Sequence, residues 1–257
     1  MMFSDQPHCY YRTNPIAEVV CQLRYPEILT IGANPPVDFQ EAIRDAFPRY
    51  TVIQERAMAN PNNSTQQQMT PNYQFMSQDG LWRINLTSRF LSLACRIYTT
   101  WEEFALHLDK PLAAFIRIYH PAYYERVGLR YVNFISRKKL GLEQVPFGEL
   151  LQPAYAGLLS EEDVVEKTFK RHALDVDCGI RSGCRAKILA GIGLVKQNGQ
   201  SSNEVMFILD HDLYMMGNIP VNHSAGALQT LHTQTFPLFR GAITDVLHDA
   251  MGPCATL

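Results

Sequence analysis

Three closely spaced apolar runs constrain this chain more than any other feature of its sequence. They cover residues 73–77, 81–87 and 90–97. Gln78-Asp79-Gly80 lies between the first two runs, and Asp-Gly readily supplies the positive φ angles of a tight hairpin turn. Short runs joined in this way are typical of antiparallel strands. The middle of the first half of the chain is therefore predicted to form consecutive antiparallel strands.

The same order of elements is predicted twice along the chain. Residues 15–119 give a strand, a helix, up to four strands and a helix, and residues 126–251 give a strand, a helix, three long strands and a helix. We expect one integral unit over 1–257 of the α+β class, with antiparallel sheets and the helices packed on one face. This order is similar to that of saddle-shaped sheets such as the TATA-box-binding fold, a likeness that by itself says nothing about ligand.

Apolar residues that recur at helical spacing predict four helices, at residues 36–47, 101–119, 145–155 and 225–251. Thr100 is expected to cap the second helix, and Pro111 to kink or divide it. Further strands are predicted at residues 16–25, 51–56, 126–136, 164–178, 186–195 and 204–213. The polar segment 59–70 is predicted to be a loop or an exposed excursion between strands.

Composition limits the classes of function. Lys and Arg number 23 and Asp and Glu number 25, giving a formal net charge of −2, which argues against binding nucleic acid by bulk charge and leaves a local basic face open. The longest run without charge or strong polarity, 188–195, is far short of the roughly 20 residues of a membrane span. Residues 1–8 do not read as a signal peptide. Six scattered cysteines fit a reduced, cytoplasmic protein.

Several segments resemble a sporadically distributed family of uncharacterised bacterial proteins of about this length. The resemblance covers nearly the whole chain, and its most specific part is Gly128-Leu-Arg-Tyr-Val-Asn133. It is also carried by Asn14-Pro-Ile-Ala-Glu18, Phe207-Ile-Leu-Asp210-His-Asp212 and Phe239-Arg-Gly-Ala-Ile-Thr-Asp245. The resemblance implies no established activity. The family's patchy distribution resembles that of accessory genes, including defence genes.

Glu18, Arg130, Tyr131 and Asn133 form the first candidate ligand-binding site. Glu18 and Arg130 lie on the first predicted strand of each half, where we expect them near one another at the centre of a sheet. Strand alternation places Tyr131 and Asn133 on one face and Arg130 on the other. Arg130 either grips an anionic or hydrogen-bonding ligand or forms a buried ion pair with Glu18. In the second case, removing either partner destabilises the fold and replacing both restores stability.

Asp175, Asp177, Asp210 and Asp212 form the second candidate site. They make two Asp-x-Asp pairs on strands predicted to be adjacent, and the carboxylates of each pair face one side. Four such carboxylates could hold Mg²⁺ or Mn²⁺ and support two-metal phosphoryl chemistry. The other interpretation is a solvated polar face.

Several other motifs are weak. Cys178 and Cys184 flank a turn and could lie close together, yet no Cys-x-x-Cys or His-Glu-x-x-His spacing accompanies them, so a structural zinc site is not expected. Gly191-x-Gly193 lies inside a predicted strand and is no dinucleotide fingerprint. Basic residues enrich the second half, but acids are interspersed among them, which favours a solvated face over a nucleic-acid surface.

The sequence therefore predicts a non-catalytic binding or accessory module without a cofactor. Its ligand would be a protein, for which a neighbouring gene would supply the partner, or a small molecule, held on the sheet surface or in the groove between the halves. The alternative is a divalent-metal-dependent enzyme that acts on phosphate esters or nucleic acid through the Asp pairs. A third possibility is nucleic-acid binding without catalysis.

Overall fold

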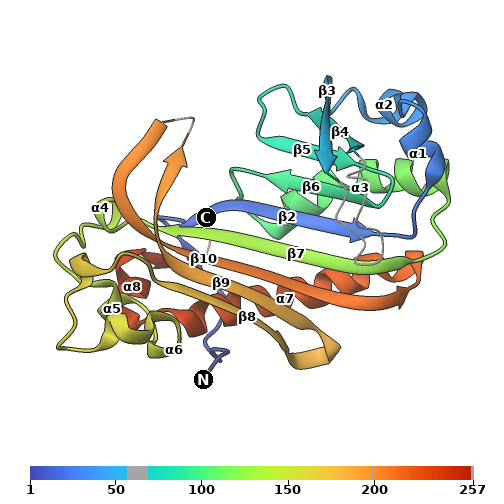
Figure 1. Ribbon diagram of the computed structural model, residues 1–257. Coiled ribbons are helices and arrows are strands. Elements are labelled where there is room, and N and C mark those ends of the chain that lie inside the picture. The colour runs from blue at the N-terminus through green and yellow to red at the C-terminus, as the bar shows by residue number, and fades with distance from the viewer. Residues whose placement is uncertain (57–68, 198–199, 256–257) are drawn as a thin grey trace, which may run out of the picture. The chain divides into compact units, whose positions relative to one another are not determined.

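A computed structural model describes residues 1–56, 69–197 and 200–255 (Figure 1). The chain combines helices with antiparallel strands, which confirms the predicted α+β class. None of the helices in these ranges has both the length and the apolar character that a membrane span requires.

Two compact units make up the chain, and each is assembled from separated segments. Unit 1 comprises residues 1–17, 130–213 and 229–257, and unit 2 comprises residues 18–129 and 214–228. Their boundaries differ from those of the predicted halves 15–119 and 126–251, because three strands contribute residues to both units. These are β2 (Ile16–Arg24), β7 (Tyr124–Ile135) and β10 (Gln200–Ile219). Whether residues 1–257 behave as one integral unit stays a prediction.

The strands of unit 2 lie in the order β3-β4-β5-β6-β2-β7-β10. The first four are β3 (Arg49–Arg56), β4 (Met69–Met76), β5 (Trp82–Leu86) and β6 (Phe90–Cys95), paired antiparallel as the turns predict. Gly80 adopts a φ of 74° in the turn between β4 and β5. Most of the predicted loop 59–70 lies outside the described residues, and its last two residues belong to β4 because that strand begins at Met69.

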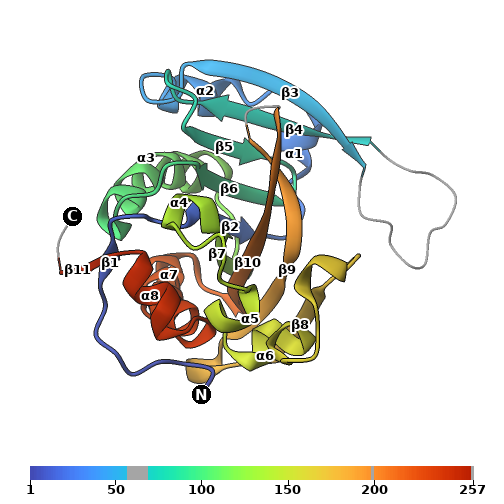
Figure 2. The same ribbon diagram turned by 90° about the vertical axis from the view of Figure 1, so that its left-hand side faces the viewer.

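Helices α2 (Val37–Ile43) and α3 (Trp101–Tyr119) pack on one face of the sheet in unit 2 (Figure 2). Aromatic rings of the helices contact aromatic rings of the strands. The ring centroids of Phe39 (α2) and Phe75 (β4) are 5.5 Å apart, and those of Phe104 (α3) and Trp82 (β5) are 5.8 Å apart. Every second residue of β5 is therefore buried against helices, and the residues between them face the other way. A short helix, α1 (Leu29–Ala33), was not predicted, because the Gly and Pro residues nearby indicated only a break.

Helix α3 is continuous through Pro111, so the predicted division there is wrong, whereas a kink at this residue stays a prediction. Thr100 caps the helix as predicted, accepting a hydrogen bond from the Glu103 amide at 3.2 Å. Phe104 and Phe115 lie on either side of Pro111 and are both fully buried. Packing on both sides of the proline stabilises the continuous helix despite the hydrogen bond that proline cannot donate.

Unit 1 holds β7, β10, β9 (Arg185–Gln197) and β8 (Ala173–Gly179), in that order. Its helices are α4 (Arg137–Leu140), α5 (Phe147–Leu150), α6 (Pro153–Ala156), α7 (Ser224–Ala242, whose first turn belongs to unit 2) and α8 (Asp245–Ala250). The short strands β1 (Tyr10–Tyr11) and β11 (Pro253–Cys254) pair separately. The described residues also include four 3-10 turns, at Gly157–Ser160, Glu166–Thr168, Arg181–Gly183 and Val221–His223.

Three predicted elements of the second half are shorter than expected. The helix expected at 145–155 is divided into α5 and α6, because Pro153 begins a new helix and cannot continue one. The strand expected from residue 164 begins only at Ala173. The last helix ends at Ala242, and α8 begins after Thr244.

Gly148, in α5, shows how closely the short elements of unit 1 are packed. A Cβ at this position would lie 1.9 Å from the carbonyl oxygen of Leu159, whereas a Cβ at Gly179 would meet nothing within 4 Å. We expect Gly148→Ala to lower the free energy of unfolding by about 2 kcal/mol, since two backbone segments must separate. Gly179→Ala is the control. Urea unfolding of both variants checks this, and equal stabilities would contradict it.

Candidate functional site

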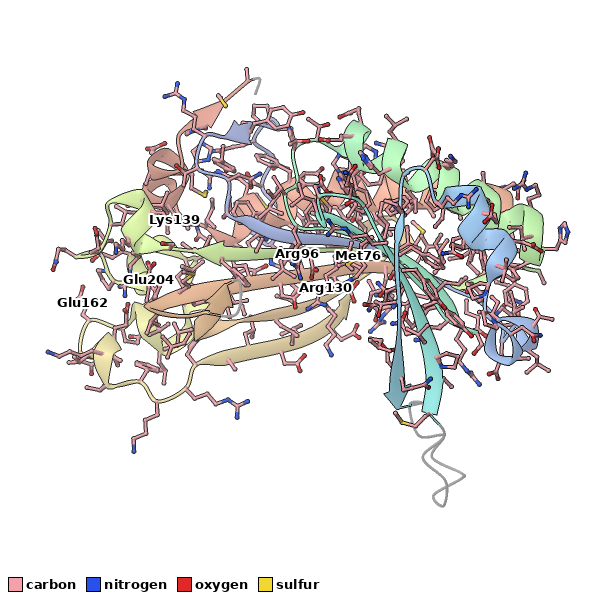
Figure 3. The ribbon with its side chains drawn as sticks, turned by 90° about the horizontal axis from the view of Figure 1, so that it is seen from above. Met76, Arg96, Arg130, Lys139, Glu162 and Glu204 are labelled. Carbon is pink, nitrogen blue, oxygen red and sulfur yellow. The ribbon has the colours of Figure 1, made fainter. Side chains whose placement is uncertain are left out.

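Arg130, labelled in Figure 3, forms a bidentate ion pair with Asp210 in unit 1. Its Nε donates to Oδ1 of Asp210 at 2.7 Å and its Nη2 to Oδ2 at 2.5 Å. The Asp210 side chain is 8% exposed and that of Arg130 is 43% exposed. The partner of Arg130 in the structure is therefore Asp210 and not the predicted Glu18. Sequence alternation could not show this, because it does not reveal which strand lies beside β7.

Glu18 belongs to unit 2, where its carboxylate lies 3.8 Å from the guanidinium of Arg83. Both side chains are about one third exposed. An ion pair of this length and exposure contributes little to stability. The predicted four-residue site is thus divided among different contacts.

Tyr131 and Asn133 lie on the opposite face of β7 from Arg130, as strand alternation predicts. The hydroxyl of Tyr131 lies 3.3 Å from Nδ1 of His232 in α7. Nδ2 of Asn133 donates to the carbonyl oxygen of Leu209 at 3.2 Å. Both side chains are buried, so they connect β7 to its neighbours inside unit 1.

The two Asp-x-Asp pairs do not lie on neighbouring strands, because β9 lies between β8 and β10. Asp175 and Asp177 on β8 are exposed, and Asp177 accepts a hydrogen bond from Arg185 at 2.8 Å. Asp210 forms its ion pair with Arg130. Asp212, the fourth predicted ligand, lies two residues further along β10. Among the described residues, no three His, Cys, Asp or Glu side chains are grouped closely enough to hold a metal ion. The geometry thus gives the proposed Mg²⁺ or Mn²⁺ site no support.

A buried histidine of β10 and a buried tyrosine of α6 lie close together inside unit 1. The rings of His211 and Tyr155 have centroids 5.9 Å apart, and Nε2 of the first and Oη of the second lack a hydrogen-bond partner within the described residues. Burial lowers the pKa of His211 from 6.5 to about 4, although Asp210 acts in the opposite direction. Burial also raises the pKa of Tyr155 above its ordinary value. Both groups are therefore neutral near pH 7.

A row of polar side chains crosses the sheet of unit 2 on the face that α2 and α3 do not cover. The strand register places its members directly opposite one another from β3 to β2: Thr51, Gln74, Asn85, Ser92 and Gln22. Arg126 of β7 and Tyr214 of β10 extend it, since the Arg126 guanidinium lies 3.5 Å from Oε1 of Gln22 and 4.6 Å above the Tyr214 ring. These seven residues are called the polar row below.

Hydrogen bonds join neighbouring members of the polar row at its centre. Nε2 of Gln74 donates to Oδ1 of Asn85 at 2.9 Å, and Nδ2 of Asn85 donates to Oγ of Ser92 at 3.0 Å. Asn85 and Ser92, at the centre, are less than one tenth exposed, whereas Gln74, Gln22 and Arg126 remain partly exposed. The row therefore has a buried, ordered centre, and its accessible groups lie on both sides of it.

Two unsatisfied polar atoms flank the polar row on the same face. Oδ1 of Asn72 and Nε of Arg83 are buried without a hydrogen-bond partner in the described residues. Asn72 precedes Gln74 by two residues on β4, and Arg83 lies opposite Met76, beyond Gln74 on the same strand (Met76 is labelled in Figure 3). One is an acceptor and the other a donor, so this face retains unused hydrogen-bonding capacity on both sides of the row.

Sequence analysis did not identify the polar row, although a signal for it was present. Each central member is one polar residue between two apolar ones, as in Tyr73-Gln74-Phe75 and Ile84-Asn85-Leu86. Such alternation predicts only which face a residue lies on. That the polar residues meet in one line depends on register, which single strands do not encode.

No protein-family model matches the sequence, and no curated protein sequence matches it. Function is therefore inferred from the geometry described above. The polar row is the candidate functional site that follows from it.

Proposed function

We propose that this protein is a non-catalytic binding module that holds a small polar ligand on the face of unit 2 that carries the polar row. The observation that supports the proposal is the alignment of amide, hydroxyl, guanidinium and phenol groups across neighbouring strands of one sheet face. A sheet needs no such alignment for stability, since apolar residues at these positions would pack at least as well. Side chains retained at some cost in stability are typical of functional sites.

The composition of the polar row indicates what kind of ligand it would hold. Amides and hydroxyls both donate and accept hydrogen bonds, so they suit a ligand with several hydroxyl or amide groups. Arg126 is already stacked on Tyr214, and together they offer a cationic and aromatic end to the row. The buried centre favours a small molecule over the broad surface of a folded protein. A neutral sugar, a nucleoside or a dipeptide amide has this chemistry.

Thermal unfolding in the presence of these three probes tests the proposal. A ligand at a hundredfold excess over its Kd stabilises a protein by about 2.7 kcal/mol. We expect at least one probe to raise the Tm of the wild-type protein by roughly 5 °C. In the triple variant Gln74→Leu, Asn85→Leu, Ser92→Ala, the shift should vanish. That variant should remain folded, because each hydrogen bond loses both of its partners together.

Gln54→Leu is the matched control, since Gln54 lies on the same sheet and alternation places it on the opposite face from Thr51. It should keep the full Tm shift. A shift that survives in the triple variant places the binding elsewhere and contradicts the proposal. So does the absence of a shift with all three probes in the wild-type protein.

A further inference from the structure

Strand β3 is the outermost strand of the sheet in unit 2, so in the described part of the chain one of its edges has no strand beside it. Its central residues are apolar and unusually exposed for their type: Tyr50 is 40% exposed, Val52 39% and Ile53 40%. An edge of this length with an apolar centre is a template for pairing with another strand. Natural proteins commonly protect such edges.

The charges of β3 are self-complementary about its centre. Arg49 is exposed near one end and Glu55 lies near the other, each three residues from Val52. If a second β3 pairs antiparallel with Val52 facing Val52, then Arg49 of each chain lies directly opposite Glu55 of the other. Thr51 faces Ile53, and Tyr50 faces Gln54, on the two faces of the joined sheet. Opposite charges that face each other across strands are stabilising, and like charges are destabilising.

Other registers lose this match. A shift of one residue on the partner strand places inward-facing side chains opposite outward-facing ones. A shift of two residues on the partner strand, with Thr51 facing Thr51, sets Arg49 opposite Ile53 and removes the charge pairs. Nδ2 of Asn72, on the neighbouring strand β4, donates to Oε1 of Glu55 at 2.7 Å, so the pairing with Arg49 of the second copy uses Oε2. Only the register centred on Val52 places Arg49 of each strand opposite Glu55 of the other.

We propose that β3 is a homodimer interface, at which two copies of this chain pair edge to edge about a two-fold axis through Val52. The partner is a second copy because the strand complements itself in charge and in apolar content. Thr51 belongs both to this edge and to the polar row, whereas the other six members of the row lie on other strands. Variants at Val52 therefore test the dimer, and the triple variant at Gln74, Asn85 and Ser92 tests ligand binding.

Sedimentation velocity of the full chain over a wide concentration range tests the interface. We expect the wild-type protein to change from monomer to dimer as its concentration rises. Val52→Lys places two ammonium groups against each other at the axis, so it should raise the dimer Kd at least about tenfold. Val246→Lys changes another half-exposed valine, in α8, and is the control that should leave the Kd unchanged.

A charge exchange distinguishes this register from any other contact. Arg49→Glu alone and Glu55→Arg alone should each weaken the homodimer, because each sets two like charges opposite each other twice. An equimolar mixture of the two variants should form a heterodimer, since both charge pairs are then restored. Wild-type protein that stays monomeric at every concentration overturns the proposal. So do single variants that dimerise like the wild type, and a mixture that fails to associate. In that case the edge serves another partner or none.

Discussion

Arg130→Met should lower the free energy of unfolding by about 3 kcal/mol, because it leaves the carboxylate of Asp210 buried without its counter-charge. The value lies at the low end for a buried ion pair, since the Arg130 side chain is 43% exposed and water partly screens the interaction. Replacing both partners, as in Arg130→Met with Asp210→Leu, should recover most of the loss. Urea unfolding of the three proteins provides the measurement.

Arg185 and Asp177 provide a control pair with the same chemistry and a different environment. Their side chains are 46% and 44% exposed, and Nη2 of Arg185 lies 2.8 Å from Oδ1 of Asp177. Arg185→Met should change the free energy of unfolding by less than about 1 kcal/mol. If the double variant of Arg130 and Asp210 is as unstable as the single one, the loss does not come from an unpaired carboxylate.

Between pH 6.5 and pH 4 the protein should lose about 3 kcal/mol of stability through His211 alone. The folded state holds this imidazole neutral down to pH about 4, whereas the unfolded chain protonates it near pH 6.5. In this window the unfolded state binds one more proton than the folded state. Stability therefore falls as pH falls, by about 1.4 kcal/mol per pH unit, and is fully present above pH 6.5.

Urea unfolding of the wild type and of His211→Leu at several pH values isolates this contribution. The difference between their free energies of unfolding should change by about 3 kcal/mol over the window, because only the wild type carries the buried imidazole. His223→Leu, at an exposed histidine, is the control: its free energy of unfolding should depend on pH as that of the wild type does. Parallel curves for the wild type and His211→Leu would show that the imidazole is not held neutral.

The periodicity of the sequence was sufficient to predict most strands and the two long helices. It identified the meander of β4, β5 and β6 because short apolar runs and the turn at Gly80 are local signals. The predicted division of the helix at Pro111 was wrong, because burial of Phe104 and Phe115 stabilises the helix on both sides of the proline. The periodicity was also wrong about the helix at 145–155, because Pro153 divides it.

The candidate sites were less predictable than the elements that carry them. Alternation correctly separated Arg130 from Tyr131 and Asn133, since facing depends only on position within one strand. It could not pair Arg130 with Asp210, because that contact depends on strand order and register over 80 residues. The polar row was missed for the same reason.

The side-chain amide signals of Gln22 and Gln74 in an NMR titration test the central claim most directly, because these accessible groups of the polar row would touch the ligand. The probe is whichever of the neutral sugar, the nucleoside or the dipeptide amide raises the Tm. We predict that the amide signals of Gln22 and Gln74 shift in proportion to its bound fraction, while that of Gln54 on the other face stays in place. Shifts confined to residues outside the polar row would contradict the assignment of this face as the binding site.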